Sequence, residues 1–150
     1  SRECAAPLPL RPAMTFRTQI VFTKRVAAGT PIGYGRTYTV PCDNSLLVTL
    51  PVGYADGYAR ALSNRAPVLI NNQRYRISGR VSMDQIIVDL GPDGSARVGD
   101  EAVLFGKQGK ETITAADIAA LLDTIVYEVT CAVSKRVPRV WIDSDTDAIS

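Results

Sequence analysis

The side chains that could do acid–base chemistry in this chain are tyrosines, because the sequence contains no histidine. Without histidine, Ser-His-Asp and Cys-His catalysis by this chain's own residues are excluded. Two of the six tyrosines stand in glycine-rich segments, Gly33-Tyr34-Gly35-Arg36 and Gly53-Tyr54-Ala55-Asp56-Gly57, where glycine allows sharp turns and close approach. A phenol acts as a base only when a nearby cation brings its pKa well below about 10. Arg36 and Arg60 are the cations nearest in sequence.

The same local patterns also fit a purely structural role. A tyrosine beside a glycine is commonly a packed, hydrogen-bonded loop residue. No glycine-rich phosphate loop of the P-loop or dinucleotide type is present. Cys4, Cys42 and Cys131 are too widely spaced for a disulfide framework or for the paired ligands of a zinc site. We therefore expect no metal site, and a reducing, cytoplasmic setting.

Length and composition restrict the class of protein. A chain of 150 residues with 46% hydrophobic and 21% charged residues fits one globular domain. The 17 basic residues are scattered and the net charge is only +2, which argues against a nucleic-acid partner. No run approaches the roughly 20 apolar residues of a membrane span. Pro7, Pro9 and Pro12 indicate that residues 1–12 form an extended linker from a preceding domain.

The elements that must position the tyrosines are mostly short strands. Runs of β-branched and aromatic residues, bounded by Gly, Pro, Asn or Asp, predict strands at residues 18–23, 45–50, 66–70, 75–78, 85–90 and 101–105. Asn71-Asn72 predicts a tight hairpin, and Pro92-Asp93-Gly94 predicts a turn. We expect a mainly β domain, either a compact barrel or a sandwich, with one or two short helices.

One helix is predicted after Thr114. Apolar residues follow at helical spacing, namely Ile118, Leu121, Leu122 and Ile125. Thr114 is a suitable N-cap, and Asp117 three residues later completes a capping box.

Four segments together resemble the pyridoxal-phosphate-dependent alanine racemase family, over roughly residues 11–141. The segments are Gly33-Tyr34-Gly35-Arg36-Thr37-Tyr38, Pro51-Val52-Gly53-Tyr54-Ala55-Asp56-Gly57, Gly79-Arg80-Val81-Ser82-Met83-Asp84-Gln85, and Tyr127-Glu128-Val129 continuing to Arg136-Val137-Pro138-Arg139. They occur in the family's order and at nearly its spacing, with Arg11-Pro12-Ala13-Met14 before them. The combination is more specific than any single segment.

The resemblance implies half of an active site. Racemases of this family have an N-terminal α/β barrel, which binds pyridoxal 5'-phosphate, and a C-terminal β-domain, which is all that this chain resembles. Their active site forms in a homodimer, between the barrel of one subunit and the C-terminal domain of the other. The implied reaction interconverts L-alanine and D-alanine, the latter for bacterial peptidoglycan. Two bases act on opposite faces of the substrate, one of them a barrel lysine that forms the Schiff base.

Residue by residue, the resemblance makes Tyr34 the second catalytic base, acting in the partner subunit's active site. It makes the Met83 backbone N–H a donor to the substrate carboxylate, and it places Tyr54 beside Tyr34 to narrow the substrate passage. Tyr127 would hydrogen-bond the cofactor phosphate.

The resemblance also assigns outer positions. Arg80 and Arg60 would lie along the substrate entry, where positive charge attracts a carboxylate. Asp84 would orient its loop. Lys24, Lys107, Lys110 and Lys135 do not match the family's lysine motif, so we expect the chain alone to be inactive.

Other hypotheses remain open from the sequence. Met83 could fill the core, Tyr127 could be an ordinary buried tyrosine, and Arg60 and Arg80 could be solvated surface charges. The chain could be a non-catalytic dimerisation or interaction module, or part of a racemase of broader amino-acid specificity. A small ligand-binding barrel is the third alternative.

Overall fold

The computed structural model describes residues 11–142. Cys4 and most of the expected linker, residues 1–10, lie outside the described residues. Arg11 and Pro12 are exposed and form neither helix nor strand.

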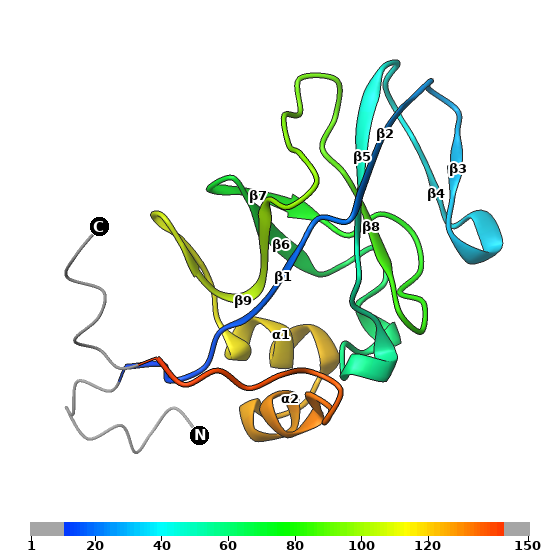
Figure 1. Cartoon of the computed structure of the whole chain (residues 1–150). Coiled ribbons are helices and arrows are strands. Elements are labelled where there is room, and N and C mark those ends of the chain that lie inside the picture. Colours follow the sequence, from blue (N-terminus) through cyan, green and yellow to red (C-terminus); the bar gives the residue numbers. More distant parts are fainter. Residues whose placement is uncertain (1–10, 143–150) are drawn as a thin grey trace.

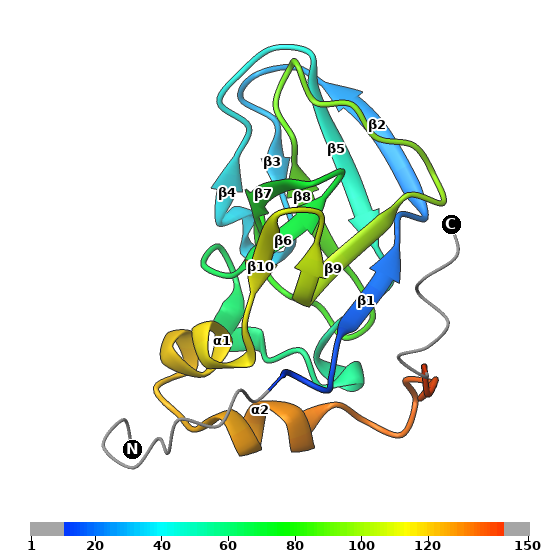
Figure 2. The ribbon, with the colours of Figure 1, turned by 90° about the vertical axis from the view of Figure 1, so that its left-hand side faces the viewer.

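The described chain is mainly antiparallel β-structure, as predicted. One sheet has the strand order β1-β9-β6-β7, with β10 also paired to β9. A second sheet has the order β2-β5-β8, and β3 and β4 form a separate hairpin. Two helices lie together below the sheets in both Figure 1 and Figure 2. The strands are β1 (Phe16–Gln19), β2 (Phe22–Val26), β3 (Pro31–Ile32), β4 (Tyr38–Thr39), β5 (Ser45–Leu50), β6 (Pro67–Ile70), β7 (Gln73–Arg76), β8 (Ile86–Asp89), β9 (Glu101–Gln108) and β10 (Glu111–Ile113).

The predicted strand at residues 18–23 is two strands that belong to different sheets. The chain leaves β1 at Gln19 and enters β2 at Phe22, where it pairs with β5. At the corner, the Ile20 N–H donates to the Asp100 carbonyl (2.9 Å) and the Val21 N–H to the Thr49 carbonyl (3.0 Å). A bridge between Ile77 and Val88 joins the sheets a second time. The domain is therefore barrel-like, with two sheets joined at two corners.

The hairpin predicted at Asn71-Asn72 is confirmed. Both residues have positive φ (50° and 63°), as a two-residue turn of the mirror-image type requires. Because the turn is so short, β7 begins at Gln73, two residues before the prediction. The turn near Pro92 is also confirmed, with the Gly94 N–H bonded to the Gly91 carbonyl.

The predicted helix is α1 (Ala115–Leu122). The capping box is present: the Asp117 N–H donates to Thr114 Oγ1 (3.0 Å), and the Thr114 N–H donates to Asp117 Oδ2 (2.7 Å). The inclusion of Ile125 was wrong, because Asp123 takes left-handed φ/ψ (55°, 48°) and ends the helix. Ile125 instead caps the second helix, α2 (Val126–Ala132).

The core lies between the sheets and above the helices. Strands β5 and β8 alternate buried and half-buried residues, whereas the central strand β9 is buried from Ala102 to Phe105. Phe105 packs edge-on against Phe16, with ring centroids 5.6 Å apart. This core forms a rigid base for the loops between the strands.

Candidate functional site

Three loops that carry predicted site residues pack backbone against backbone. The loops are residues 33–37, 51–57 and 79–84; the first two contain short 3-10 turns at Tyr34–Arg36 and Tyr54–Asp56. The glycines explain the close approach. A Cβ on Gly33 would lie 3.2 Å from the Arg80 nitrogen, and one on Gly53 would lie 2.3 Å from the carbonyl oxygens of Ser82 and Met83.

Hydrogen bonds fix the second loop to the third. The Tyr54 N–H donates to the Ser82 carbonyl and the Ala55 N–H donates to the Met83 carbonyl, both at 3.0 Å. The backbones of Tyr54 and Met83 are therefore held next to each other. Gly33 brings the loop of Tyr34 against the same third loop.

Arg136, which follows α2 in the sequence, joins the second loop to the third. Its Nε lies 3.3 Å from Asp56 Oδ1, and its terminal guanidinium nitrogen donates to Asp84 Oδ1 at 2.7 Å. The bond to Asp84 raises the pKa of Arg136. Asp56 is buried and also accepts from the Gly53 N–H (2.9 Å). The loop-orienting role expected for Asp84 is consistent with this contact.

Exposure divides the six tyrosines into two groups. Tyr34, Tyr54 and Tyr127 have 75%, 45% and 77% of their surface exposed. None of their hydroxyls forms a hydrogen bond within residues 11–142. The three packed tyrosines are different: the Tyr38 hydroxyl donates to Asp89 (3.0 Å), the Tyr75 hydroxyl donates to Gln73 (2.6 Å), and Tyr58 is buried in the core.

The exposed tyrosines are those that the sequence assigned to the site. Burial, followed by the bond to Asp89, raises the pKa of Tyr38, and burial raises the pKa values of Tyr75 and Tyr58. These three are poorly suited to act as bases, because a raised pKa keeps the phenol protonated.

Met83 does not fill the core. Its residue surface is 51% exposed, so that alternative was wrong. The Met83 carbonyl accepts a hydrogen bond from Ala55, but its N–H donates to no group in the described part of the chain. An unpaired backbone N–H on a rigid loop is available to an anionic group.

Tyr127 lies on α2, away from the three loops in sequence. The expectation of an ordinary buried tyrosine was also wrong, because the side chain is exposed. The end of α2 packs on the second loop: the Ser134 N–H donates to the Asp56 carbonyl (3.0 Å), and a Cβ on Gly57 would lie 2.0 Å from the Ala132 carbonyl oxygen. The helix is thus fixed to the loop of Tyr54, although no hydrogen bond joins the Tyr127 side chain to Tyr34, Tyr54 or Met83 within the described residues.

The two predicted entry arginines are both exposed. Neither Arg60 nor Arg80 makes an ion pair within residues 11–142, so a solvated surface role and an entry role both agree with their positions. The cation expected near the Tyr34 hydroxyl is not in hydrogen-bond contact with it among the described residues. Arg36 follows in the same turn, with a left-handed φ of 49°.

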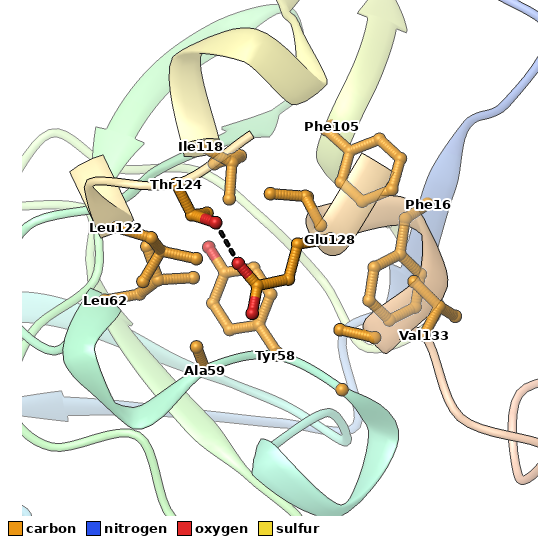
Figure 3. A pocket seen from close by; sticks show the side chains of 13 residues that line it. Phe16, Tyr58, Ala59, Leu62, Phe105, Ile118, Leu122, Thr124, Glu128 and Val133 are labelled. Carbon is orange, nitrogen blue, oxygen red and sulfur yellow. Dashed lines mark hydrogen bonds between the residues drawn. The ribbon is translucent and has the colours of Figure 1, made fainter. Parts of the chain in front are cut away.

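A cavity of about 270 Å³ lies elsewhere, between the two helices and the core. Figure 3 shows Tyr58 pointing its hydroxyl towards the pair formed by Thr124 and Glu128, whose side chains are hydrogen-bonded. The Tyr58 hydroxyl itself has no hydrogen-bond partner in the described structure. The lining is otherwise apolar, with Leu62 and Phe105 among its side chains. Gly57 is the one residue of the three glycine-rich loops that lines it, and none of the predicted site residues does, so we place the candidate site on the open surface instead.

Between residues 11 and 142, no three His, Cys, Asp or Glu side chains are grouped so that they could hold a metal ion. None of the described helices is long and apolar enough to span a membrane.

The barrel-like fold and its three loops together define a class of protein, and other known proteins belong to the same class. The family model "Alanine racemase, C-terminal domain" matches residues 13–141. The chain belongs to that family. The alanine racemase of Cutibacterium acnes is 53% identical over 133 residues, which are 89% of this chain and 35% of the relative. That of Halothermothrix orenii is 50% identical over 141 residues, 94% of this chain and 37% of the relative.

Solved structures agree with this assignment. Alanine racemase from E. faecalis superposes with a TM-score of 0.85 at 40% identity, over 92% of this chain and 36% of that chain. Alanine racemase from Bacillus anthracis, crystallised with bound L-Ala-P, gives a TM-score of 0.86 at 37% identity, over 92% and 35% of the two chains. The chain therefore spans about a third of the length of these relatives.

Sequence reasoning missed two residues that organise the site. Asp56 and Arg136 were given no role of their own and were named only as members of matching segments. A signal for Asp56 was present, since an acidic residue three positions after Gly53 can cap a short turn. The pairing of Arg136 with Asp56 and Asp84 spans 80 and 52 residues of sequence, and no local pattern reveals it.

Proposed function

We propose that this chain is the C-terminal domain of an alanine racemase that interconverts L-alanine and D-alanine with pyridoxal 5'-phosphate. Tyr34 is one of the two bases and acts in the partner subunit's active site. The observation that carries the proposal is the joining of three loops on which Tyr34, Tyr54 and Met83 are exposed. Among residues 11–142, neither the two tyrosine hydroxyls nor the Met83 N–H forms a hydrogen bond.

The proposed role of Tyr34 follows from its exposure. The Tyr34 hydroxyl is bonded to no group among residues 11–142, so it can contact a substrate presented by another domain. Racemisation needs a second base on the face opposite the first, because the proton must leave one face and return to the other. Tyr34 gives or takes that proton at its hydroxyl oxygen.

Met83 and Tyr54 bind and select the substrate. The unpaired Met83 N–H donates to the substrate carboxylate, and the Asp84–Arg136–Asp56 contacts hold the Met83 loop in place. Tyr54 beside it restricts the passage, which favours a side chain as small as that of alanine. Exposed Arg80 and Arg60 attract the carboxylate towards the passage.

The residues present fit one end of the cofactor. The exposed Tyr127 hydroxyl, which has no partner in the described structure, can donate to a phosphate oxygen. When bound, pyridoxal phosphate makes the α-hydrogen of the amino acid acidic enough to be removed. Of the four lysines, Lys24, Lys107 and Lys110 lie on or beside strands and Lys135 follows α2. We expect none of them to hold the cofactor covalently, and the chain alone to be inactive.

The proposal includes an N-terminal barrel domain and a homodimer. Ile125, Val126 and Tyr127 form consecutive exposed apolar surface at the start of α2 (63%, 40% and 77%), as is typical of an interface. In this arrangement residues 1–150 are one domain and residues 1–12 lead from the barrel. We also place the enzyme in the cytoplasm, in the supply of D-alanine for peptidoglycan.

Alanine racemisation by the longer gene product that contains this segment tests the proposal. Tyr34→Phe should keep the cofactor absorbance and lose turnover by about 10²-fold or more, because it removes an acid–base group. Tyr75→Phe is the matched control, since it removes a tyrosine hydroxyl that bonds only Gln73. Turnover should then remain close to that of the wild type.

Other outcomes identify the alternatives. A wild-type protein that associates but does not racemise any amino acid would support the interaction module. Racemisation of serine or basic amino acids at rates similar to alanine would indicate the broader enzyme. Equal turnover of Tyr34→Phe and wild type would reject Tyr34 as a base.

A further inference from the structure

Asn64 connects the loop of Tyr34 to the loop of Met83 through a single side-chain amide. Its Oδ1 accepts from the Gly79 N–H at 2.6 Å, and its Nδ2 donates to Thr37 Oγ1 (3.1 Å) and to the Thr37 carbonyl (3.3 Å). Its backbone N–H donates to the Gly79 carbonyl at 3.2 Å. Thr37 follows Tyr34 by three residues, and Gly79 begins the segment that contains Met83.

The chemistry of this position requires an asparagine. The Gly79 N–H needs an acceptor and the Thr37 carbonyl needs a donor, and an amide supplies both from one side chain. Asn64 also has a left-handed φ of 57°, which asparagine tolerates better than most residues. The preceding turn, Arg60–Leu62, is fixed to the third loop as well, because the Val81 N–H donates to Ser63 Oγ at 2.9 Å.

The loop of Tyr34 has few other attachments. Within the described chain, the hydrogen bonds that join residues 33–37 to the rest of the domain are the two from the Asn64 amide. The flanking strands β3 and β4 pair over only two residues each. The Gly33 backbone packs closely on Gly79 and Arg80, but this contact is not directional, as a hydrogen bond is.

We propose that Asn64 is a positioning residue that fixes the Tyr34 hydroxyl relative to the Met83 N–H. The inference rests on the proposed racemase function. Proton transfer is sensitive to displacement, since an error of about 1 Å can cost about 10²-fold in rate. Asn64 contacts no part of the reacting groups and acts through the two loops.

The test uses the full-length, cofactor-loaded enzyme and the variant Asn64→Asp. A carboxylate still accepts from the Gly79 N–H and tolerates the same φ, but it repels the Thr37 carbonyl, and only the Thr37 hydroxyl can still bond to it, as the donor. The third loop should keep its place while the attachment of the Tyr34 loop is weakened. Asn44→Asp is the matched control, because Asn44 has the same φ of 57° and no side-chain hydrogen bond among residues 11–142.

The expected result separates positioning from general damage. Asn64→Asp should lower kcat by about tenfold or more, with KM for alanine and cofactor absorbance within twofold of the control. With α-deuterated alanine, the isotope effect should rise in the reaction direction in which Tyr34 removes the α-hydrogen, and fall in the other. A purely structural defect would not change the two directions oppositely.

A second variant covers the case in which Asn64→Asp fails to fold. Asn64→Gly retains the left-handed φ and removes all three side-chain bonds, so both kcat and KM should deteriorate. Wild-type racemisation with both variants equal to Asn44→Asp would overturn the inference alone. Absence of racemisation by the wild type would instead overturn the proposed function.

Discussion

Gly53 should tolerate no larger residue, although its backbone conformation would permit one. Its φ and ψ (−155°, −163°) are extended, so alanine brings no backbone strain. The difficulty is contact: an added Cβ would lie 2.3 Å from the carbonyl oxygens of both Ser82 and Met83. These are main-chain atoms of the adjoining loop, so Gly53→Ala must push the two loops apart.

The size of the effect follows from what must move. Overpacking of this kind costs about 1–3 kcal/mol. Separating the loops also breaks the bonds of the Tyr54 and Ala55 N–H groups to the third loop, which adds about 1–3 kcal/mol for the two. A loss of about 4 kcal/mol is a large part of the roughly 5–15 kcal/mol that stabilises a domain.

Urea denaturation of the chain measures this loss, with Gly29→Ala as the control. Gly29 has a φ of 80° and open space around its Cβ position, so alanine there should cost about 1 kcal/mol from backbone strain alone. Gly53→Ala should be the more destabilised by about 3 kcal/mol, with an unchanged m-value. If Gly53→Ala were as stable as Gly29→Ala, the close packing of the two loops would be refuted.

Three further changes have defined outcomes. Arg136→Gln should lower the free energy of unfolding, and less so at high salt, because its partner Asp56 is buried but the guanidinium is half-exposed; a loss unaffected by salt would contradict the ionic explanation. Tyr58→Phe should be neutral or stabilising by about 1 kcal/mol, since the buried hydroxyl has no partner, and a clear loss in thermal unfolding would reveal an unrecognised bond. The hydrogen bond from the Thr114 N–H lowers the pKa of Asp117 from its usual 3.8; the folded state therefore favours the carboxylate, and its contribution is present above about pH 4 and is lost as the pH falls through the lowered pKa. Asp117→Asn should accordingly lose less stability than wild type between pH 5 and 3, and parallel curves would contradict this sign.

Local patterns predicted the fold where a structural rule operates over a few residues. The Asn71-Asn72 turn and the Thr114–Asp117 capping box are examples, since each depends on residues adjacent or three apart. The same patterns failed at residues 18–23, where a continuous apolar run does not show that the chain passes from one sheet to another. The hairpin formed by β9 and β10 was missed because residues 106–111 are all polar or glycine and lack the alternation of apolar and polar residues that indicates a strand.

The candidate site was predictable only as a set of segments. The glycines beside Tyr34 and Tyr54 indicated close approach, and the structure shows that the partner is the loop of Arg80 and Met83. The contacts of Asn64 and Arg136 could not be predicted, because they join residues that are far apart in sequence and have ordinary local surroundings.

The position of β9 in the sequence determines when β1 can pair during synthesis. Within residues 11–142, β1 pairs only with β9, so Phe16 cannot pair with Phe105 until residue 105 has been synthesised. At about 5–20 residues per second the delay is on the order of ten seconds, during which β1 has an unpaired edge that invites association with other chains. The sheet of β2, β5 and β8 is complete earlier, at Asp89. On the ribosome, the sheet made of β2, β5 and β8 should therefore form first, and β1 can join the domain only after residue 105 has been translated.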